Sequence, residues 1–241
     1  MIEVKELSVF YNESTPALEN ISFTLEKPAI VGIIGPNGAG KSTLIKAMLH
    51  IINHKGKTLI DKHSAKSYLK KIAYVEQKSD VDYTFPIKVK ECVSLGTYSS
   101  VGVMRKLKSK DWERVFNALD KVGLSSFAER QISELSGGQF QRVLLARCLV
   151  QEADYIFLDE PFVGIDSISE RIIMEILDSL KEEGKIILIV HHDLSKVKSY
   201  FDEVIIINKN LIDYGETDKT FTGKNLIKAY GEGIFVGGIT E

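Results

Sequence analysis

Cysteine is scarce in this chain, and so are tryptophan and proline. The 241 residues include two cysteines, one tryptophan and five prolines. Cys92 and Cys148 are isolated in the sequence and form no CxxC pair, so the spacing does not indicate a metal or redox role. We expect both to be small core or surface residues of a protein in a reducing compartment.

Long apolar runs and an excess of one charge are also missing. No stretch approaches the ~20 apolar residues that cross a bilayer, and residues 1–6 alternate apolar and charged side chains, unlike a signal peptide. The formal net charge is only −2, which provides no field to attract nucleic acid or an anionic membrane. The composition therefore predicts a soluble, cytoplasmic protein with no nucleic-acid partner.

The residues that are present suit one large α/β domain. Of the chain, 44% is hydrophobic and 27% charged, enough for a substantial core. Residues 1–27 have the alternation of β-strands, interrupted by a polar turn at 12–16, and 29–34 is an apolar run typical of a buried strand. After residue 153, strands and helices alternate, which predicts a parallel sheet with helices on its faces. We expect these elements at 155–158, 168–182, 186–190, 194–200 and 203–208.

The region 85–151 has a different pattern. Its apolar residues recur at helical spacing, and Gly123 follows one such run as a helix stop. We interpret 85–151 as a helical subdomain inserted into an α/β core formed by 1–84 and 152–241. The tail at 231–241 is rich in glycine, and we expect it to be loosely ordered.

A phosphate-binding motif follows the apolar run at 29–34. It matches G-x-x-x-x-G-K-[ST] between a strand and a helix, the context that this motif requires. Backbone N–H groups of such a loop bind phosphate, the lysine reaches the β- and γ-phosphates, and the serine hydroxyl binds Mg²⁺. The alternative is an ordinary glycine-rich turn. The predicted ATP and Mg²⁺ site comprises Gly35, Pro36, Asn37, Gly38, Ala39, Gly40, Lys41, Ser42 and Thr43.

Two acidic residues end the apolar run at 155–158. Carboxylates at the carboxyl end of a parallel strand lie where such sheets bind ligands. Asp159 is predicted to hold Mg²⁺, and Glu160 to polarise the attacking water. Apolar strands that end in acids are common, so this prediction depends on the phosphate loop.

A second anion-binding surface is predicted in the helical region. Ser136 is placed to cap a helix, and a helix N-terminus with a hydroxyl and two glycines attracts anions. A capped helix after a glycine turn, without any ligand, is the alternative. The motif comprises Leu135, Ser136, Gly137, Gly138 and Gln139.

The phosphate loop, the Leu-Ser-Gly-Gly-Gln motif and the strand ending in Asp-Glu occur in an order that resembles the ABC-type ATPase family. The resemblance covers nearly the whole chain. It implies a single domain over 1–241: an α/β P-loop NTPase core with a mostly parallel sheet, an N-terminal antiparallel β subdomain and an inserted α-helical subdomain. It also implies ATP hydrolysis in a head-to-tail homodimer, with each ATP held between the phosphate loop of one copy and Ser136 of the other.

The resemblance assigns further residues. Tyr11 is similar to the aromatic residue that stacks on adenine, although a core aromatic is the alternative. Gln77 is similar to the glutamine that contacts Mg²⁺ and the attacking water, and a solvated glutamine is its alternative. His192, rather than His191, matches the histidine that contacts the γ-phosphate, with a strand-end histidine bonded to backbone as the alternative. Asp166 matches an acid at the dimer interface.

One position departs from the family pattern. Val163 stands where the family often has a small hydroxyl residue, so a side-chain hydrogen bond from that point is lost. This departure affects the communication between the two sites of a dimer.

Several segments look like the subgroup that serves manganese, zinc and iron importers. They lie at 81–89, 141–147, 161–166 and 190–194, the last favouring manganese. The subgroup implies membrane permease subunits that contact residues near 77–98, an extracytoplasmic metal-binding protein, and a location at the cytoplasmic face of the membrane. Another cargo, or an ABC ATPase outside transport, is the alternative. His50, His54 and His63 are expected to be ordinary surface histidines.

Overall fold

The computed structural model describes residues 1–12, 15–77, 85–102 and 105–232. Most of the expected tail at 231–241, from 233 on, and part of the expected permease contact, 78–84, lie outside these residues. The chain divides into two compact units, Met1–Tyr68 with Ile186–Glu241, and Leu69–Lys185. The predicted division at 85 and 151 remains a prediction.

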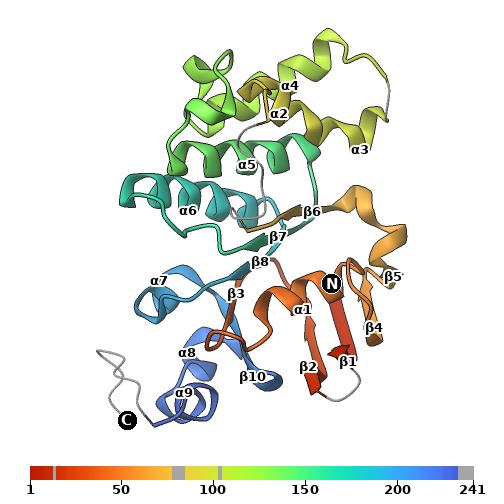
Figure 1. The fold of residues 1–241 in the computed structure, drawn as a ribbon, viewed down its shortest axis with the longest axis vertical. Helices are drawn as coiled ribbons and strands as arrows, with labels where there is room; N and C mark the ends of the chain where they lie inside the picture. The colour runs from red at the N-terminus through yellow and green to blue at the C-terminus, as the bar shows by residue number, and fades with distance from the viewer. Residues whose placement is uncertain (13–14, 78–84, 103–104, 233–241) are drawn as a thin grey trace. The chain divides into compact units, whose positions relative to one another are not determined.

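The first unit contains two sheets with short helices (Figure 1). An antiparallel sheet has the strand order β2-β1-β4-β5, and in the other sheet the order is β10-β9-β3-β8, where β3 is parallel to β8 and β9. Its elements are β1 (Ile2–Asn12), β2 (Thr15–Leu25), β3 (Ala29–Ile34), α1 (Lys41–Met48), β4 (Lys55–Ile60), β5 (His63–Ser64), η1 (Ala65–Ser67), β8 (Ile186–Val190), η7 (Leu194–Lys196), α7 (Val197–Tyr200), β9 (Glu203–Asn208), β10 (Asn210–Glu216), α8 (Thr217–Thr220) and α9 (Gly223–Tyr230).

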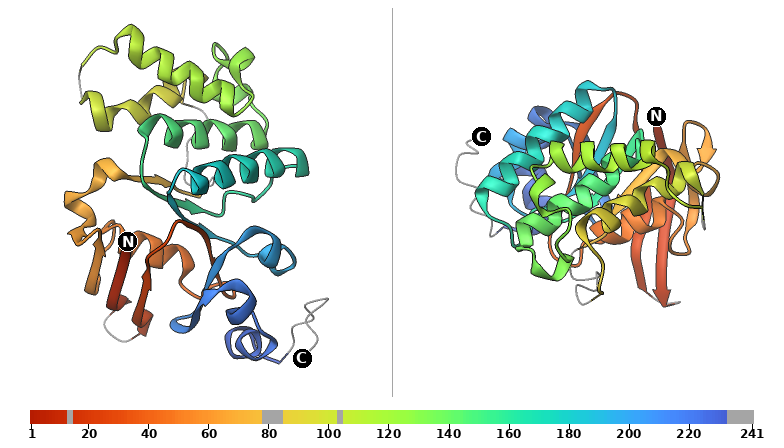
Figure 2. Two further views of the ribbon diagram at one scale, coloured as in Figure 1. Left: turned by 180° about the vertical axis from the view of Figure 1, so that it is seen from behind. Right: turned by 90° about the horizontal axis from the view of Figure 1, so that it is seen from above.

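The second unit contains a parallel strand pair and the longer helices. Helices α2 and α4 both pack on α5 (Figure 2). Its elements are η2 (Leu69–Lys71), β6 (Ile72–Val75), α2 (Val89–Ser94), η4 (Leu95–Thr97), α3 (Tyr98–Val101), α4 (Ser109–Lys121), η5 (Ser125–Phe127), η6 (Ile132–Glu134), α5 (Gly137–Gln151), β7 (Tyr155–Asp159) and α6 (Ser167–Glu182).

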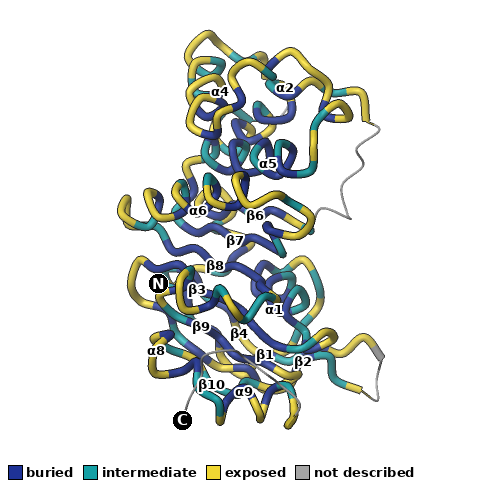
Figure 3. The backbone as a smooth tube through the Cα atoms, turned by 90° about the vertical axis from the view of Figure 1, so that its left-hand side faces the viewer, coloured by how far each residue is buried: buried dark blue, intermediate teal, exposed yellow. Residues whose placement is uncertain are grey.

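The predicted buried strands are present. All residues of β3, β7 and β8 are buried, as are the four apolar residues at the centre of β9 (Figure 3). These apolar runs form strands because parallel strands are buried on both faces of the sheet, so apolar residues suit every position. The expected strands at 186–190 and 203–208 have exactly the observed bounds, and Gly123, at φ 67°, follows α4 as predicted.

The expected helix at 194–200 was only partly correct. The segment is a 3₁₀ turn, η7, followed by the four-residue helix α7, and the Asp193 side chain caps the turn by accepting from the Ser195 amide at 3.0 Å. Strand β1 continues to Asn12 and β2 begins at Thr15, so both strands extend into the polar turn that was expected at 12–16. A shift in their register between Val4 and Leu7 surrounds Glu6, at φ 50°, which explains why the apolar alternation of β1 changes phase there.

Both cysteines are buried. Burial raises the pKa of Cys148 to about 11 and raises that of Cys92 as well, so both thiols stay protonated near neutral pH. Among the described residues, no helix is both long and apolar enough to span a membrane.

Candidate functional site

The phosphate loop connects β3 to α1. Gly38 and Gly40 have φ values of 79° and 94°, a conformation that favours glycine. The ammonium group of Lys41 is buried and donates to the carbonyl oxygens of Gly35 at 2.8 Å and Pro36 at 3.1 Å. Helix α1 begins directly after the loop without a side-chain cap at Gly40, and the first amide groups of a helix have no acceptor within the helix. These donors fit the phosphate groups of ATP.

Close packing holds this loop against both sheets of its unit. A Cβ atom at Gly35 would lie 2.1 Å from the Ile207 carbonyl oxygen in β9, and one at Gly40 would lie 2.5 Å from a methyl group of Leu18 in β2. The Lys209 amide also donates to the Ala39 carbonyl at 3.0 Å. Lys209 and Leu18 support the loop, but no local sequence signal identifies them, because their contacts join distant segments.

Another residue beside the loop was missed. Burial raises the pKa of Tyr230 to about 12, and the nearby backbone of Gly35 opposes part of this rise. Tyr230 is the last residue of α9, and its distance along the chain from Gly35 hides this proximity from sequence analysis.

Tyr11 lies next to the start of α1. Its hydroxyl is 3.2 Å from the Thr43 hydroxyl, and the residue is 64% exposed. Tyr11 is therefore not a core aromatic, and its ring is accessible to a planar ligand. Its role in stacking on adenine remains a prediction.

The two neighbouring histidines after β8 differ in environment. His191 is buried and lies against Phe201, with ring centroids 5.3 Å apart, whereas His192 is exposed. Ile33 of β3 pairs with Val190 of β8 in a parallel register. His192 and the phosphate loop thus follow neighbouring strands at the same edge of the sheet, where parallel sheets bind ligands.

The second unit has the same arrangement at the end of its strand pair. Val75 of β6 pairs with Leu158 of β7, so Gln77 and Glu160 each follow two residues after the paired positions. The Gln77 side-chain amide donates to Glu160 at 2.8 Å. Gln77 is therefore not merely solvated, and it holds one oxygen of the predicted general base.

Asp159 and Glu160 differ in exposure. Asp159 is buried at 2% exposure, whereas Glu160 is half-buried and has a φ of 52°. A left-handed conformation is uncommon for glutamate and sharply redirects the chain after β7. Carboxylate, amide and hydroxyl oxygens are ligands that Mg²⁺ accepts, so the residue types of Asp159, Gln77 and Ser42 fit the predicted ion, and their joint binding of it remains a prediction. Ser42 belongs to the first unit and the other two belong to the second.

The predicted motif at 135–139 begins α5 as expected. The Ser136 hydroxyl accepts from the Gln139 amide at 3.3 Å, and the Ser136 amide donates to the Gln139 side chain at 2.9 Å. This reciprocal capping box orders the helix N-terminus. A Cβ atom at Gly138 would lie 2.3 Å from the Ser169 hydroxyl, so α5 and α6 approach closely at this glycine.

Asp166 caps the N-terminus of α6. Its carboxylate accepts from the Ile168 and Ser169 amides at 3.1 and 2.9 Å and from the Ser169 hydroxyl at 2.8 Å. These bonds, above all those from Ser169, lower the pKa of Asp166. Asp166 and Val163 are both exposed, so both are accessible to a second molecule. Their place at a dimer interface remains a prediction.

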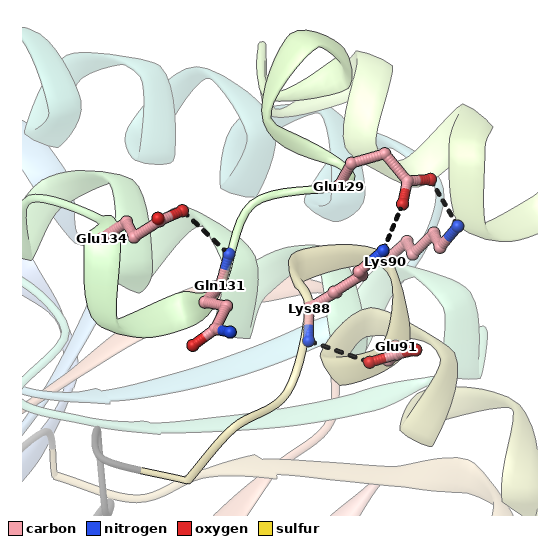
Figure 4. Close-up of polar contacts among 6 residues, drawn as sticks. All are labelled: Lys88, Lys90, Glu91, Glu129, Gln131 and Glu134. Carbon is pink, nitrogen blue, oxygen red and sulfur yellow. Dashed lines mark hydrogen bonds and ion pairs between the residues drawn. The ribbon is translucent and has the colours of Figure 1, made fainter.

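Charged residues tie the segment before Ser136 to the start of α2 (Figure 4). Glu129 pairs with Lys88 at 2.9 Å and also with Lys90, and these contacts lower the Glu129 pKa to about 2. Backbone bonds join the same segments, from the Ile132 amide to the Ile87 carbonyl and from the Val89 amide to the Arg130 carbonyl. The segment that contains Phe85 is thereby linked to the one that leads into Ser136.

Comparisons with known proteins agree with this geometry. The family model described as "ABC transporter" matches residues 18–163. The manganese transport system ATP-binding protein MntB of Listeria innocua is 44% identical over 232 residues, which cover 96% of each chain. The zinc transport system ATP-binding protein TroB of Treponema pallidum is 41% identical over 231 residues, 95% of this chain and 86% of that protein.

Solved structures show the same fold. The protein cbiO1 from Clostridium perfringens, part of the ABC transporter complex cbiONQ, has a TM-score of 0.78 at 31% identity, covering 94% of this chain and 92% of that one. A bacterial ABC transporter cassette solved as a dimer has a TM-score of 0.78 at 26% identity, covering 90% and 98%. These matches confirm the predicted fold class.

Proposed function

Because the chain belongs to the ABC transporter family and is one of its ATPases, we propose that it works as a head-to-tail homodimer that powers import of a divalent transition metal. The assignment of a metal as the cargo rests on the 44% identity, over nearly the full length of both chains, to a protein named for manganese transport. Manganese is favoured, and zinc and iron are the alternatives, since a relative at 41% identity is named for zinc. The dimeric form of a similar cassette supports the homodimer.

We propose these roles for the chain's own residues. Lys41 and the loop amides bind the β- and γ-phosphates, and Tyr11 stacks on adenine. Ser42, Asp159 and Gln77 would hold Mg²⁺, which neutralises phosphate charge. Glu160, oriented by Gln77, polarises the attacking water, and His192 contacts the γ-phosphate.

The partner copy completes the site in this proposal. Its Ser136 hydroxyl and the N-terminus of its α5 provide further donors for the γ-phosphate. Donors on both sides also exclude water from the reaction. ATP then joins the two copies, and hydrolysis with phosphate release separates them and drives the permease.

Uptake into reconstituted vesicles tests the cargo. The chain is combined with its permease and extracytoplasmic binding protein, and Mn²⁺, Zn²⁺ and Fe²⁺ are each supplied on the side of the binding protein. We expect ATP-dependent accumulation of Mn²⁺ in excess of the other two ions. Accumulation of Zn²⁺ or Fe²⁺ instead would change the assigned metal, and transport of none of them would refute metal import.

The permease is proposed to contact the described part of 77–98 and to place this subunit at the cytoplasmic face of the membrane. Phe85 is 59% exposed and Tyr98 is 44% exposed, whereas Val89 is fully buried. A charged residue at Val89 would disrupt the core, so the exposed positions are the ones to test.

Phe85→Glu is therefore expected to weaken association with the permease by about tenfold or more, the effect of losing one aromatic anchor. Binding is measured with permease in detergent, and ATP affinity of the free subunit should not change. Phe116→Glu is the matched control, because Phe116 is a 44% exposed phenylalanine on α4. Equal association of both variants would place the permease contact elsewhere.

A further inference from the structure

Two histidines lie side by side after the phosphate-loop helix. His50 follows the end of α1 with a φ of 56°, and its amide donates to the Ala47 carbonyl at 2.9 Å. The rings of His50 and His54 have centroids 4.5 Å apart at an interplanar angle of 55°. Both residues are half-buried. Helix α1 ends at Met48, so both histidines lie beyond it and the turn that follows the helix positions their rings.

A backbone carbonyl orients the His54 ring. Nδ1 of His54 lies 3.2 Å from the Ile52 carbonyl oxygen, which accepts only, so Nδ1 carries the proton and Nε2 is the nitrogen that faces a ligand. Nε2 of His50 is buried and has no hydrogen-bond partner among the described residues. This unpartnered nitrogen is the one through which the His50 ring would bind a ligand.

This pattern is that of histidine ligands to a metal. A metal-bound imidazole usually donates its other ring N–H to a carbonyl or carboxylate, which sets the tautomer. With metal–nitrogen bonds of about 2.0–2.1 Å, two imidazoles that share one tetrahedral ion have ring centres roughly 5 Å apart. The observed 4.5 Å is close to this value. The two rings are therefore near enough to share one ion.

The surroundings of His50 favour its unprotonated form, and a nearby lysine limits the affinity of the pair for a cation. Burial, followed by the neighbouring His54 and Lys66, lowers the pKa of His50, so its ring is unprotonated near neutral pH. Lys66 in η1 opposes a bound cation. Among the described residues, no third histidine, cysteine or carboxylate completes a cluster. Water would occupy the remaining positions, and the ion would exchange readily.

We propose that Nε2 of His50 and Nε2 of His54 together bind one exchangeable, borderline divalent ion of the Zn²⁺ type. Imidazole ligands favour Zn²⁺ over Mn²⁺ and exclude the hard ion Mg²⁺. The site adjoins the C-terminal end of α1, whose N-terminus forms the phosphate loop. It is separate from the nucleotide site and does not rest on the proposed cargo.

The test is a titration of the purified full chain with Zn²⁺, without nucleotide and with millimolar Mg²⁺, monitored by competition with a chromophoric chelator. We expect one Zn²⁺ per chain and at least ~10-fold weaker binding of Mn²⁺. His50→Asn, chosen because asparagine tolerates positive φ, and His54→Gln should each weaken Zn²⁺ binding about 10- to 100-fold. His63→Gln is the control and should bind as the unaltered chain does, since the His63 ring stacks on Tyr68 instead.

Nitrogen-15 NMR of the histidine rings in the unaltered chain provides a readout that needs no variant. Zn²⁺ should shift Nε2 of both His50 and His54, and leave the proton on Nδ1. Absence of stoichiometric binding, retention of affinity in both variants, or ring shifts confined to His191 and His192 would each overturn the proposal. Thermal unfolding confirms that the variants are folded.

Discussion

Glu160→Gln is expected to reduce steady-state ATP hydrolysis at least ~100-fold, the scale of losing a general base. The substitution keeps the size of the side chain and removes the carboxylate that polarises water. ATP binding should persist, because the phosphate-loop donors are unchanged. The variant should also elute as a dimer with ATP and as a monomer without it. Phosphate release measures the rate, and size-exclusion chromatography measures the dimer.

A second glutamate offers a matched control. Glu152 has a φ of 54°, close to the 52° of Glu160, and lies in the same unit, where it pairs with Arg114 at 3.3 Å. Glu152→Gln therefore tests the same substitution in the same backbone conformation, and hydrolysis should remain near the unaltered rate. If Glu160→Gln also hydrolysed ATP at that rate, Glu160 would not be the general base.

Lys41→Met is expected to impair ATP binding, a step that precedes hydrolysis. Methionine lacks the ammonium donor, so the phosphates lose their main cationic contact. We expect hydrolysis to fall about 100- to 1,000-fold, as when one preorganised donor is removed from a developing charge. ATP affinity should fall as well, so ATP should no longer induce the dimer. Equilibrium binding of a fluorescent ATP analogue separates this outcome from that of Glu160→Gln.

The hydrogen bonds of Lys41 within the loop make a control for folding necessary. Its ammonium group donates to the carbonyls of Gly35 and Pro36, and those acceptors lose their donor in the variant. Thermal unfolding should therefore accompany the binding measurement. Lys46→Met removes a lysine from the same helix outside the motif, and its ATP affinity should not change. Normal ATP binding by Lys41→Met would show that the phosphate loop is not the nucleotide site.

Local patterns were sufficient for much of the fold. The apolar runs at 186–190 and 203–208 matched the strands exactly, because consecutive β-branched residues have few alternatives to a buried strand. The phosphate loop and the helix cap at Ser136 were likewise recognisable, since glycine conformation and capping depend on residues a few positions apart. Elements such as β10 and α9 were missed because, at seven and eight residues, they are too short to show a distinct hydrophobic period.

In the candidate site, local patterns predicted the separate motifs but not the contacts between distant segments. Residue types alone indicated a phosphate loop, a strand ending in two acids and a capped helix, because each motif is contiguous. Long-range pairing was needed to place His192 beside the loop and to bond Gln77 to Glu160. It was also needed to bring the rings of His50 and His54 together and to bury Val89. These contacts depend on strand register and on turns with positive φ, which no short window of sequence encodes.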